Sequence, residues 1–188
     1  MTELAGSKRP RETRMQVLLL FLTLLQAGTG AQPGPPEQPP SAETHPLAAR
    51  YYELGMRAAG KADWSGAVRQ FRLAVKYAPK SPAAHNSLGA AFLETGEVDR
   101  AVTEFRKAIA LGPQFTEAYF NMARALERRK DLDGAMQFYR RVIGRRPDRA
   151  DAHFALGHVL QQRGQTAEGE AELKEACRLD ARLCPGQD

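Results

Sequence analysis

The most restrictive feature of this chain is a period of 34 residues, marked by three prolines, Pro79, Pro113 and Pro147. Four further series keep the same period: Ala67, Ala101 and Ala135; Phe71, Phe105, Tyr139 and Leu173; Leu54, Leu88, Met122 and Leu156; and Gly55, Gly89, Ala123 and Gly157. A fixed period of this length is typical of stacked supersecondary units. Such stacks usually present surface and seldom carry out chemistry, so we expect the chain to act through partners.

Length and charge narrow the classes of partner. The chain has 188 residues, which is room for one domain of ordinary size plus tails. Its formal charge is +5, of which residues 1–31 contribute +2, so the remainder carries +3 with acidic and basic residues interspersed. This pattern is typical of a mixed, solvated surface and does not favour a nucleic-acid partner.

Residues 1–31 have the three parts of a secretory signal peptide. Basic residues Lys8, Arg9, Arg11 and Arg14 precede an apolar run at 17–25, and small residues follow at 27–31. The run is well short of the roughly 20 residues that span a bilayer. A cleaved signal is the favoured interpretation, while an uncleaved short anchor helix and a buried core helix stay open. Met15 is an alternative start to Met1.

Residues 32–47 form a proline-rich linker with six prolines. Proline lacks a backbone donor and fixes φ, so this stretch is expected to adopt extended polyproline geometry. The repeats follow over residues 48–183, as four blocks at 48–81, 82–115, 116–149 and 150–183, and residues 184–188 form a tail.

Each block contains two helical patterns. In the second block His85, Leu88, Gly89 and Phe92 fall on one face of a helix over about 83–95, and Gly96 suits the left-handed turn that ends it. A second helix then runs until Pro113. Small residues of the glycine series facing those of the alanine series let the paired helices approach closely, and the aromatic series fills the wedge beside each pair. Stacking with a constant small rotation predicts an all-α, right-handed superhelical solenoid of antiparallel helix pairs with a concave side.

Leu88-Gly89, Phe92, Ala101, Phe105, Ala108 and Pro113 resemble the signature of the tetratricopeptide repeat, and the resemblance covers four repeats. The fourth copy departs from the pattern, with Gly169 in place of Ala and Ala181 in place of Pro. Its second helix is heavily charged, as expected of a terminal repeat that faces water.

The resemblance implies that the first helix of each repeat lines a concave groove that binds a protein or peptide. The groove residues that it implies are Tyr52, Met56, Asn86, Ala90, Leu93, Phe120, Asn121, Arg124, Phe154 and His158. Tyr52, Phe120 and Phe154 share one repeat position, which predicts an aromatic-lined trough. The family's carboxylate clamp for chaperone C-termini is not supported, because Tyr52, Met56, Asp151 and Ala155 stand at or near its positions.

The sequence offers no catalytic residues, cofactor site or metal site. His85 and His153 lie two periods apart, at the position of Tyr51 and Tyr119, and are interpreted as packing residues. No carboxylate or cysteine cluster accompanies His158. No phosphate-binding loop or nucleophile elbow is present. We therefore expect a protein that is not an enzyme and needs no cofactor.

Cys177 and Cys184 are the two cysteines of the chain. Seven residues of continuous helix span about 10 Å, too far for a disulfide, so a bridge requires the last helix to end near Ala181 and fold back. An intramolecular bridge, free thiols and intermolecular pairing all stay open. The expected function is an exported adaptor, periplasmic or secreted, or anchored through residues 1–31 if these are not cleaved. The alternative is self-assembly into a homo-oligomer through the exposed terminal repeat.

Overall fold

The computed structural model describes residues 46–184, which form helices and no strand. Residues 1–45, and with them the predicted signal segment and most of the linker, lie outside the described residues. The α-helices are α2 (Pro46–Gly60), α3 (Trp64–Tyr77), α4 (Pro82–Glu94), α5 (Val98–Leu111), α6 (Thr116–Arg128), α7 (Leu132–Arg145), α8 (Ala150–Gln162) and α9 (Thr166–Leu179), followed by the 3-10 helix η1 (Ala181–Leu183). Over this range no helix has the length and apolar character needed to cross a membrane.

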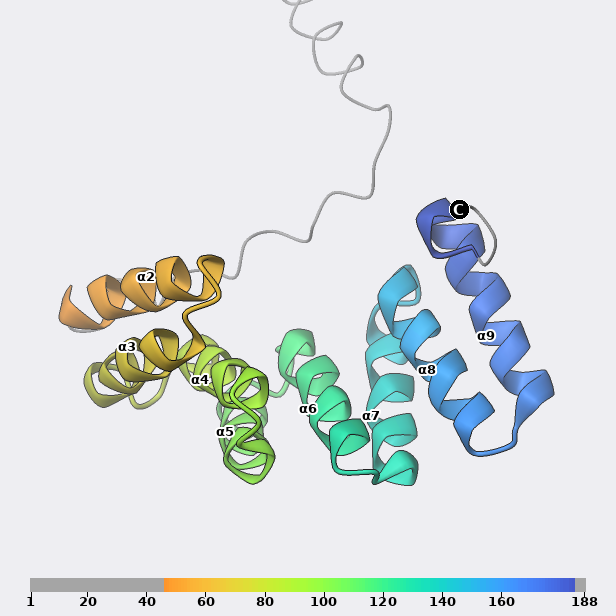
Figure 1. Ribbon diagram of the computed structural model, residues 1–188, viewed down its shortest axis with the longest axis horizontal. Helices are drawn as coiled ribbons and strands as arrows, with labels where there is room; N and C mark the ends of the chain where they lie inside the picture. Colours follow the sequence, from red (N-terminus) through yellow and green to blue (C-terminus); the bar gives the residue numbers. More distant parts are fainter. Residues whose placement is uncertain (1–45, 185–188) are drawn as a thin grey trace, which may run out of the picture. The chain divides into compact units, whose positions relative to one another are not determined.

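These helices follow one another along an arc, each packed against the next (Figure 1). They pair as antiparallel hairpins, α2 with α3, α4 with α5, α6 with α7 and α8 with α9, as the 34-residue period predicts. Helices α4 and α6 are also in direct contact, although α5 separates them in sequence. The first helices of the hairpins therefore lie toward the inner side of the arc.

The first helix begins earlier than predicted. Helix α2 starts at Pro46, two residues before the expected start of the first repeat at Ala48. Proline is favoured in the first turn of a helix, where its missing N–H would have no intrahelical partner. Pro46 therefore belongs to the folded part of the chain.

Local signals set the other helix ends. Asp63 and Asp131 accept hydrogen bonds from the backbone N–H three residues later, at 2.8 and 3.0 Å, and so cap α3 and α7. Ser81 caps α4 in the same way, at 3.2 Å from the N–H of Ala84. The hairpin turns pass through left-handed backbone at one equivalent position in every repeat, occupied by Ala62, Gly96, Lys130 and Gly164.

The glycine series allows close helix packing, as predicted. The glycines face the aromatic series, however, and not mainly the alanine series. A Cβ atom on Gly89 would lie 2.7 Å from Cε1 of Phe105, so the glycine makes room for the aromatic ring and not primarily for Ala101. In the fourth repeat a Cβ on Gly157 would lie 2.9 Å from the backbone oxygen of Gly169. Gly169 thus replaces alanine where the two helix backbones of the last hairpin approach most closely.

The core is formed by residues that recur at the same repeat positions. The alanine series is fully buried, and so are the aromatic rings of Phe71, Phe105 and Tyr139 between successive hairpins. Leu173, at the equivalent position in α9, is only half-buried, and among the described residues no further hairpin packs after α9. Burial of large side chains at each junction stabilises the stack, which a single hairpin cannot do alone.

Candidate functional site

All the residues predicted to line the groove lie on the inner helices α2, α4, α6 and α8. Some of their side chains are exposed, and others are buried. Tyr52, Asn86 and Leu93 are buried, so the prediction that they line an accessible groove is corrected. Tyr52 packs against the ring of Phe71, with centroids 5.7 Å apart, and its hydroxyl accepts a hydrogen bond from Ser87 at 3.2 Å. These three side chains hold the stack together and offer no surface to a partner.

Two arginines of α6 extend toward α4 on the face formed by α2, α4, α6 and α8, which we call the inner wall. Arg124 pairs with Glu94 at 3.2 Å, and Arg128 donates to the carbonyl oxygen of Leu93 at 2.7 Å. Arg128 also lies 3.5 Å from the Glu94 carboxylate. Two cations of the third repeat therefore reach back to one carboxylate of the second, which fixes their position on the inner wall.

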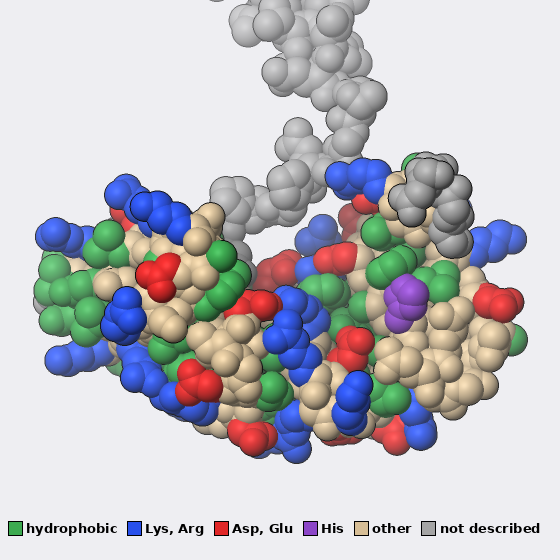
Figure 2. Space-filling view, viewed as in Figure 1, with side chains coloured by type: hydrophobic (Ala, Val, Ile, Leu, Met, Phe, Trp, Pro, Cys, Tyr) green, Lys and Arg blue, Asp and Glu red, His purple; other side chains and the backbone are tan. Residues whose placement is uncertain are grey.

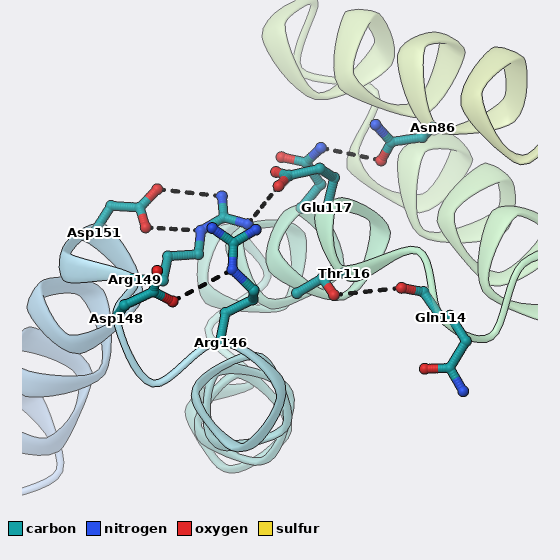
Figure 3. A network of polar contacts seen from close by, with 9 residues as sticks. Asn86, Gln114, Thr116, Glu117, Arg146, Asp148, Arg149 and Asp151 are labelled. Atoms are coloured by element: carbon teal, nitrogen blue, oxygen red, sulfur yellow. Dashed lines mark hydrogen bonds and ion pairs between the residues drawn. The ribbon is translucent and has the colours of Figure 1, made fainter. Parts of the chain in front are cut away.

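A second group of polar contacts joins the second, third and fourth repeats near the N-terminal ends of the inner helices (Figure 3). The side-chain amide of Asn121 donates to that of Asn86 at 3.0 Å. Asn121 was predicted to contact a partner, and it is already engaged with the neighbouring repeat. The amide pair therefore sets the register between repeats.

Arg149 is a largely buried charged residue beside the predicted groove residue Phe120, and no sequence signal predicted its position. Its side chain is only 13% exposed and donates to Glu117 at 2.7 Å and to Asp151 at 2.8 Å (Figure 3). Its guanidinium carbon lies 4.2 Å from the centre of the Phe120 ring. Burial opposes the charged form, but the hydrogen bonds to Asp151 and Glu117 outweigh it and raise the pKa of Arg149. The arginine covers Phe120, so this aromatic is not open to a partner from that side.

Accessible apolar surface remains at two places on the inner wall. Met56 on α2 is 50% exposed. On α8 the half-buried ring of Phe154 stands edge-on to the exposed ring of His158, with centroids 4.4 Å apart. Phe120 lies between them in sequence, packed edge-on to Tyr139 at 5.6 Å. Because Tyr52 is buried and Arg149 covers one side of Phe120, the predicted aromatic-lined trough is reduced to two separate apolar contacts with a polar stretch between them.

His85 and His153 are buried and have the packing role that their repeat position predicted. Each also forms hydrogen bonds through both ring nitrogens. His85 lies 2.6 Å from Glu104 and 3.0 Å from the carbonyl oxygen of Pro79. His153 repeats this arrangement with Glu172 at 2.6 Å and the carbonyl oxygen of Pro147 at 3.1 Å. Each histidine joins the two helices of its hairpin. Between residues 46 and 184, no group of three or more potential metal ligands comes together.

Cys177 and Cys184 form an intramolecular disulfide, with Cα atoms 4.6 Å apart. The geometry that a bridge required is present, because α9 ends at Leu179 and η1 turns the chain back toward the helix. The disulfide fastens this turn to the exposed end of the stack. Of the alternatives that the sequence left open, the structure has the intramolecular bridge.

Charge on the surface is mixed, as composition predicts. Lys and Arg side chains alternate with Asp and Glu over the face seen in Figure 2, with apolar patches between them. Many of these charges pair across repeats, as Arg140 does with Glu168 at 3.4 Å and Arg163 with Asp133 at 2.7 Å. Such exposed pairs contribute little stability individually.

The fold and its inner wall define an α-helical repeat solenoid built from antiparallel hairpins. One model of the tetratricopeptide repeat matches the chain over residues 52–114 and 93–150, and a second model of the same repeat matches residues 127–181. The chain belongs to the tetratricopeptide repeat family. The comparison with curated proteins gave no match.

Solved structures with the same fold share little sequence with the chain. A MamA fragment from Desulfovibrio magneticus RS-1 is 23% identical, with a TM-score of 0.67 over 73% of this chain and 78% of that one. YrrB, described as a TPR protein with an unusual peptide-binding site, is 22% identical, with a TM-score of 0.64 over 72% and 71%. The first TPR domain of Spaghetti (RPAP3), bound to the HSP90 peptide SRMEEVD, is 20% identical, with a TM-score of 0.61 over 63% and 94%. At these identities the likeness concerns the fold.

Proposed function

We propose that this protein is a non-catalytic adaptor that binds a protein or peptide on the inner wall of its repeat stack. The observation that carries the proposal is the pair of apolar contacts, Met56 on α2 and Phe154 with His158 on α8, on either side of a polar wall. Apolar anchors with polar groups between them are a common arrangement in peptide recognition. YrrB and the RPAP3 domain, which share the fold, are described with a peptide-binding site and a bound peptide.

The wall is preorganised by contacts between repeats. Arg124 and Arg128 are held by Glu94, and Asn121 is held by Asn86, so few side chains must be ordered when a partner binds. Preorganisation lowers the entropic cost of association. The proposed partner segment is extended or helical and places apolar side chains at Met56 and at Phe154.

The proposed location is outside the cytoplasm. Two observations support it: the signal-like residues 1–31 and the disulfide between Cys177 and Cys184. Stable disulfides form in oxidising compartments and are rare in the cytosol. Sequencing the N-terminus of the protein isolated from cells tests this proposal. A mature N-terminus near Ala31 supports export with cleavage, and an intact N-terminus on membrane-bound protein supports the anchor.

The alternative function, self-assembly through the ends of the stack, is disfavoured by the residues at those ends. Arg50 and Arg57 occupy the positions that are buried small apolar residues in the other repeats, namely Ala84, Ala118 and Ala152 for Arg50, and Ala91, Ala125 and Val159 for Arg57. At the other end Glu170 is exposed where Val68, Val102 and Met136 are buried. Charged residues at these positions prevent a further repeat from packing in the internal geometry. Sedimentation of a single monomeric species with and without reductant is the expected result.

A photo-crosslinking amino acid placed at Met56 or His158 tests the adaptor proposal in intact cells. We expect both inner-wall positions to capture the same partner, because both lie on the proposed binding surface. Arg106 is the matched control, since it is exposed on α5, a second helix of a hairpin. Capture of that partner from Arg106 with equal yield, or from neither inner position, would show that the inner wall is not the binding surface.

A further inference from the structure

Every second helix of the stack carries a cation at one repeat position. These cations are Arg72 on α3, Arg106 on α5, Arg140 on α7 and Lys174 on α9, and we call them the outer cation row. They lie one 34-residue period apart, and all four side chains are exposed. Because the first helices lie toward the inner side of the arc, the second helices and the outer cation row lie on its outer side (Figure 1).

The positive charge of the described chain is concentrated on these outer helices. Helices α3, α5 and α7 together carry nine Lys and Arg residues against three Asp and Glu, an excess of six. The inner helices α2, α4 and α6 carry four of each and are neutral. Helix α9 carries four glutamates, so the excess is confined to the first three hairpins. Their outer side therefore attracts anions, and their inner side does not.

The cations of the outer cation row are poorly neutralised, whereas the arginines of the inner wall are bound to a carboxylate of α4. Within the described part of the chain, Arg72 and Arg106 have no carboxylate at ion-pair distance. Arg140 lies 3.4 Å from Glu168, and both of these side chains are more than half exposed. Such an exposed pair contributes little stability, so an external anion can compete for the arginine.

Arg72 also lines a pocket between the first and second hairpins, with a volume of about 290 Å³. Arg100 lines the same pocket, and the guanidinium carbons of Arg72 and Arg100 lie 5.4 and 4.1 Å from the centre of the Phe92 ring. Contact with a ring restricts where a guanidinium group can lie. Glu97 pairs with Arg100, and Glu104 is bound to a histidine and a lysine of its own hairpin. Arg72 is thus the cation of the pocket that is left for an external anion.

The outer side lacks the features that bind protein segments or nucleic acids. Protein segments usually gain affinity from apolar anchors, and of the large apolar side chains exposed among the described residues only Leu111 lies on an outer helix. The rings of Phe92 and Tyr119 are buried and covered by arginines, so they offer no stacking surface to nucleic-acid bases. Attraction between charges is the interaction that this side offers.

The curvature of the outer side favours a linear ligand over a flat one. A flat lipid bilayer can contact the convex side of an arc only over a short stretch, whereas a flexible polymer can follow it from hairpin to hairpin (Figure 1). Each hairpin adds one cation at a fixed interval, so a polymer with regularly repeated anionic groups gains a further contact with every repeat. Linked contacts of this kind bind far more tightly than any one of them alone.

We propose that the outer cation row binds an acidic polysaccharide, whose carboxylate or sulfate groups pair with Arg72, Arg106 and Arg140. Arginine suits this role because its planar fork forms two hydrogen bonds with one anionic group. The inference goes beyond the adaptor function and does not rest on it, because it concerns the opposite side of the stack. A protein partner on the inner wall and a polysaccharide on the outer side do not compete for the same residues.

Heparin, a sulfated and carboxylated polysaccharide, is the probe, and calorimetric titration of the full chain is the measurement. Heparin is expected to bind and to dissociate as sodium chloride is added, because salt screens exposed charges. The triple substitution Arg72→Gln, Arg106→Gln and Arg140→Gln should weaken binding about tenfold. Arg106→Gln alone should weaken it about twofold, and this side chain has no ion pair to lose.

The matched control is the triple substitution Arg57→Gln, Lys61→Gln and Lys130→Gln. It removes the same charge from exposed positions that lie outside the outer helices. All variants keep the basic residues near the N-terminus, so a difference in heparin binding reflects the substituted positions. The control should bind heparin within about twofold of the wild type, and both triple variants should melt at the wild-type temperature, because exposed substitutions change stability little.

Several results would overturn the proposal. Equal losses in the two triple variants would show that heparin responds to net charge alone. A heparin disaccharide that binds as tightly as a long chain would show that no row of cations is used. Tighter binding of polyglutamate, single-stranded DNA or vesicles containing phosphatidylglycerol would assign the outer side to an acidic protein, a nucleic acid or a membrane instead.

Discussion

Replacing Glu104 with glutamine tests how the stack is held together inside a hairpin. The Glu104 carboxylate lies on α5 and bonds to His85 on α4 at 2.6 Å and to Lys107 at 2.8 Å. Its side chain is only 12% exposed. Glutamine keeps the shape of the side chain and removes its charge, so Glu104→Gln isolates the charge-assisted part of these hydrogen bonds.

The expected cost follows from the burial of the two partners. A hydrogen bond to a charged group contributes about 1.5–3 kcal/mol, against about 1 kcal/mol for a neutral one. Lys107 is half exposed and adds little. We therefore expect Glu104→Gln to reduce the free energy of unfolding by about 1.5 kcal/mol. Glu172→Gln removes the same contact to His153 but from a side chain that is 30% exposed, and should cost about half as much.

The same substitution changes the response to acid. Burial alone raises the pKa of Glu104, but the hydrogen bonds from His85 and Lys107 outweigh it and hold this pKa below its usual value of 4.5. A carboxyl group with a lowered folded-state pKa stabilises the fold above pH 4.5, and this stabilisation is lost as the pH falls through the folded-state pKa. The difference in stability between wild type and Glu104→Gln should therefore shrink as the pH falls below 4.5 and through the folded-state pKa.

Urea unfolding of the full chain, followed by circular dichroism at several pH values, measures these differences. Glu170→Gln is the control, because Glu170 is exposed, and it should change stability by less than about 0.5 kcal/mol. Equal costs for Glu104→Gln and Glu172→Gln would refute the argument from burial. A stability difference for Glu104→Gln that does not change with pH would refute the argument from ionisation.

Four further substitutions have defined outcomes. His85→Tyr should cost about 1.5–3 kcal/mol in thermal unfolding, because it removes the bond to the Glu104 carboxylate, although a tyrosine hydroxyl can still donate to the Pro79 carbonyl as Tyr119 does to that of Pro113 at 3.1 Å; unchanged stability would contradict this. Cys184→Ser should cost about 2 kcal/mol and increase hydrogen exchange at the end of α9 alone; increased exchange throughout the stack would contradict a local role for the disulfide. Leu93→Ala should cost about 2–5 kcal/mol because Leu93 is fully buried, whereas Met56→Ala should mainly weaken partner binding; equal stability losses would contradict the assignment of Met56 to the surface.

The sequence by itself determined the architecture. The 34-residue series of prolines, small residues and aromatics is a pattern that only stacked helical hairpins satisfy, because each hairpin needs the next to cover its apolar face. The helix ends were also encoded locally, by capping residues such as Asp63, Ser81 and Asp131 and by glycines at the left-handed turns. These features depend on residues close in sequence or one repeat apart, so a single sequence contains them.

The tertiary structure alone decided which inner residues are open to a partner. Leu93 and Phe154 both belong to the inner face by repeat position, yet Leu93 is buried and Phe154 is half-exposed. Arginines of α6 reach back to the Glu94 carboxylate and to the backbone oxygen of Leu93 on α4, whereas among the described residues no later hairpin reaches back to α8. Accessibility depends on the length and direction of side chains from neighbouring hairpins, and repeat position does not specify either.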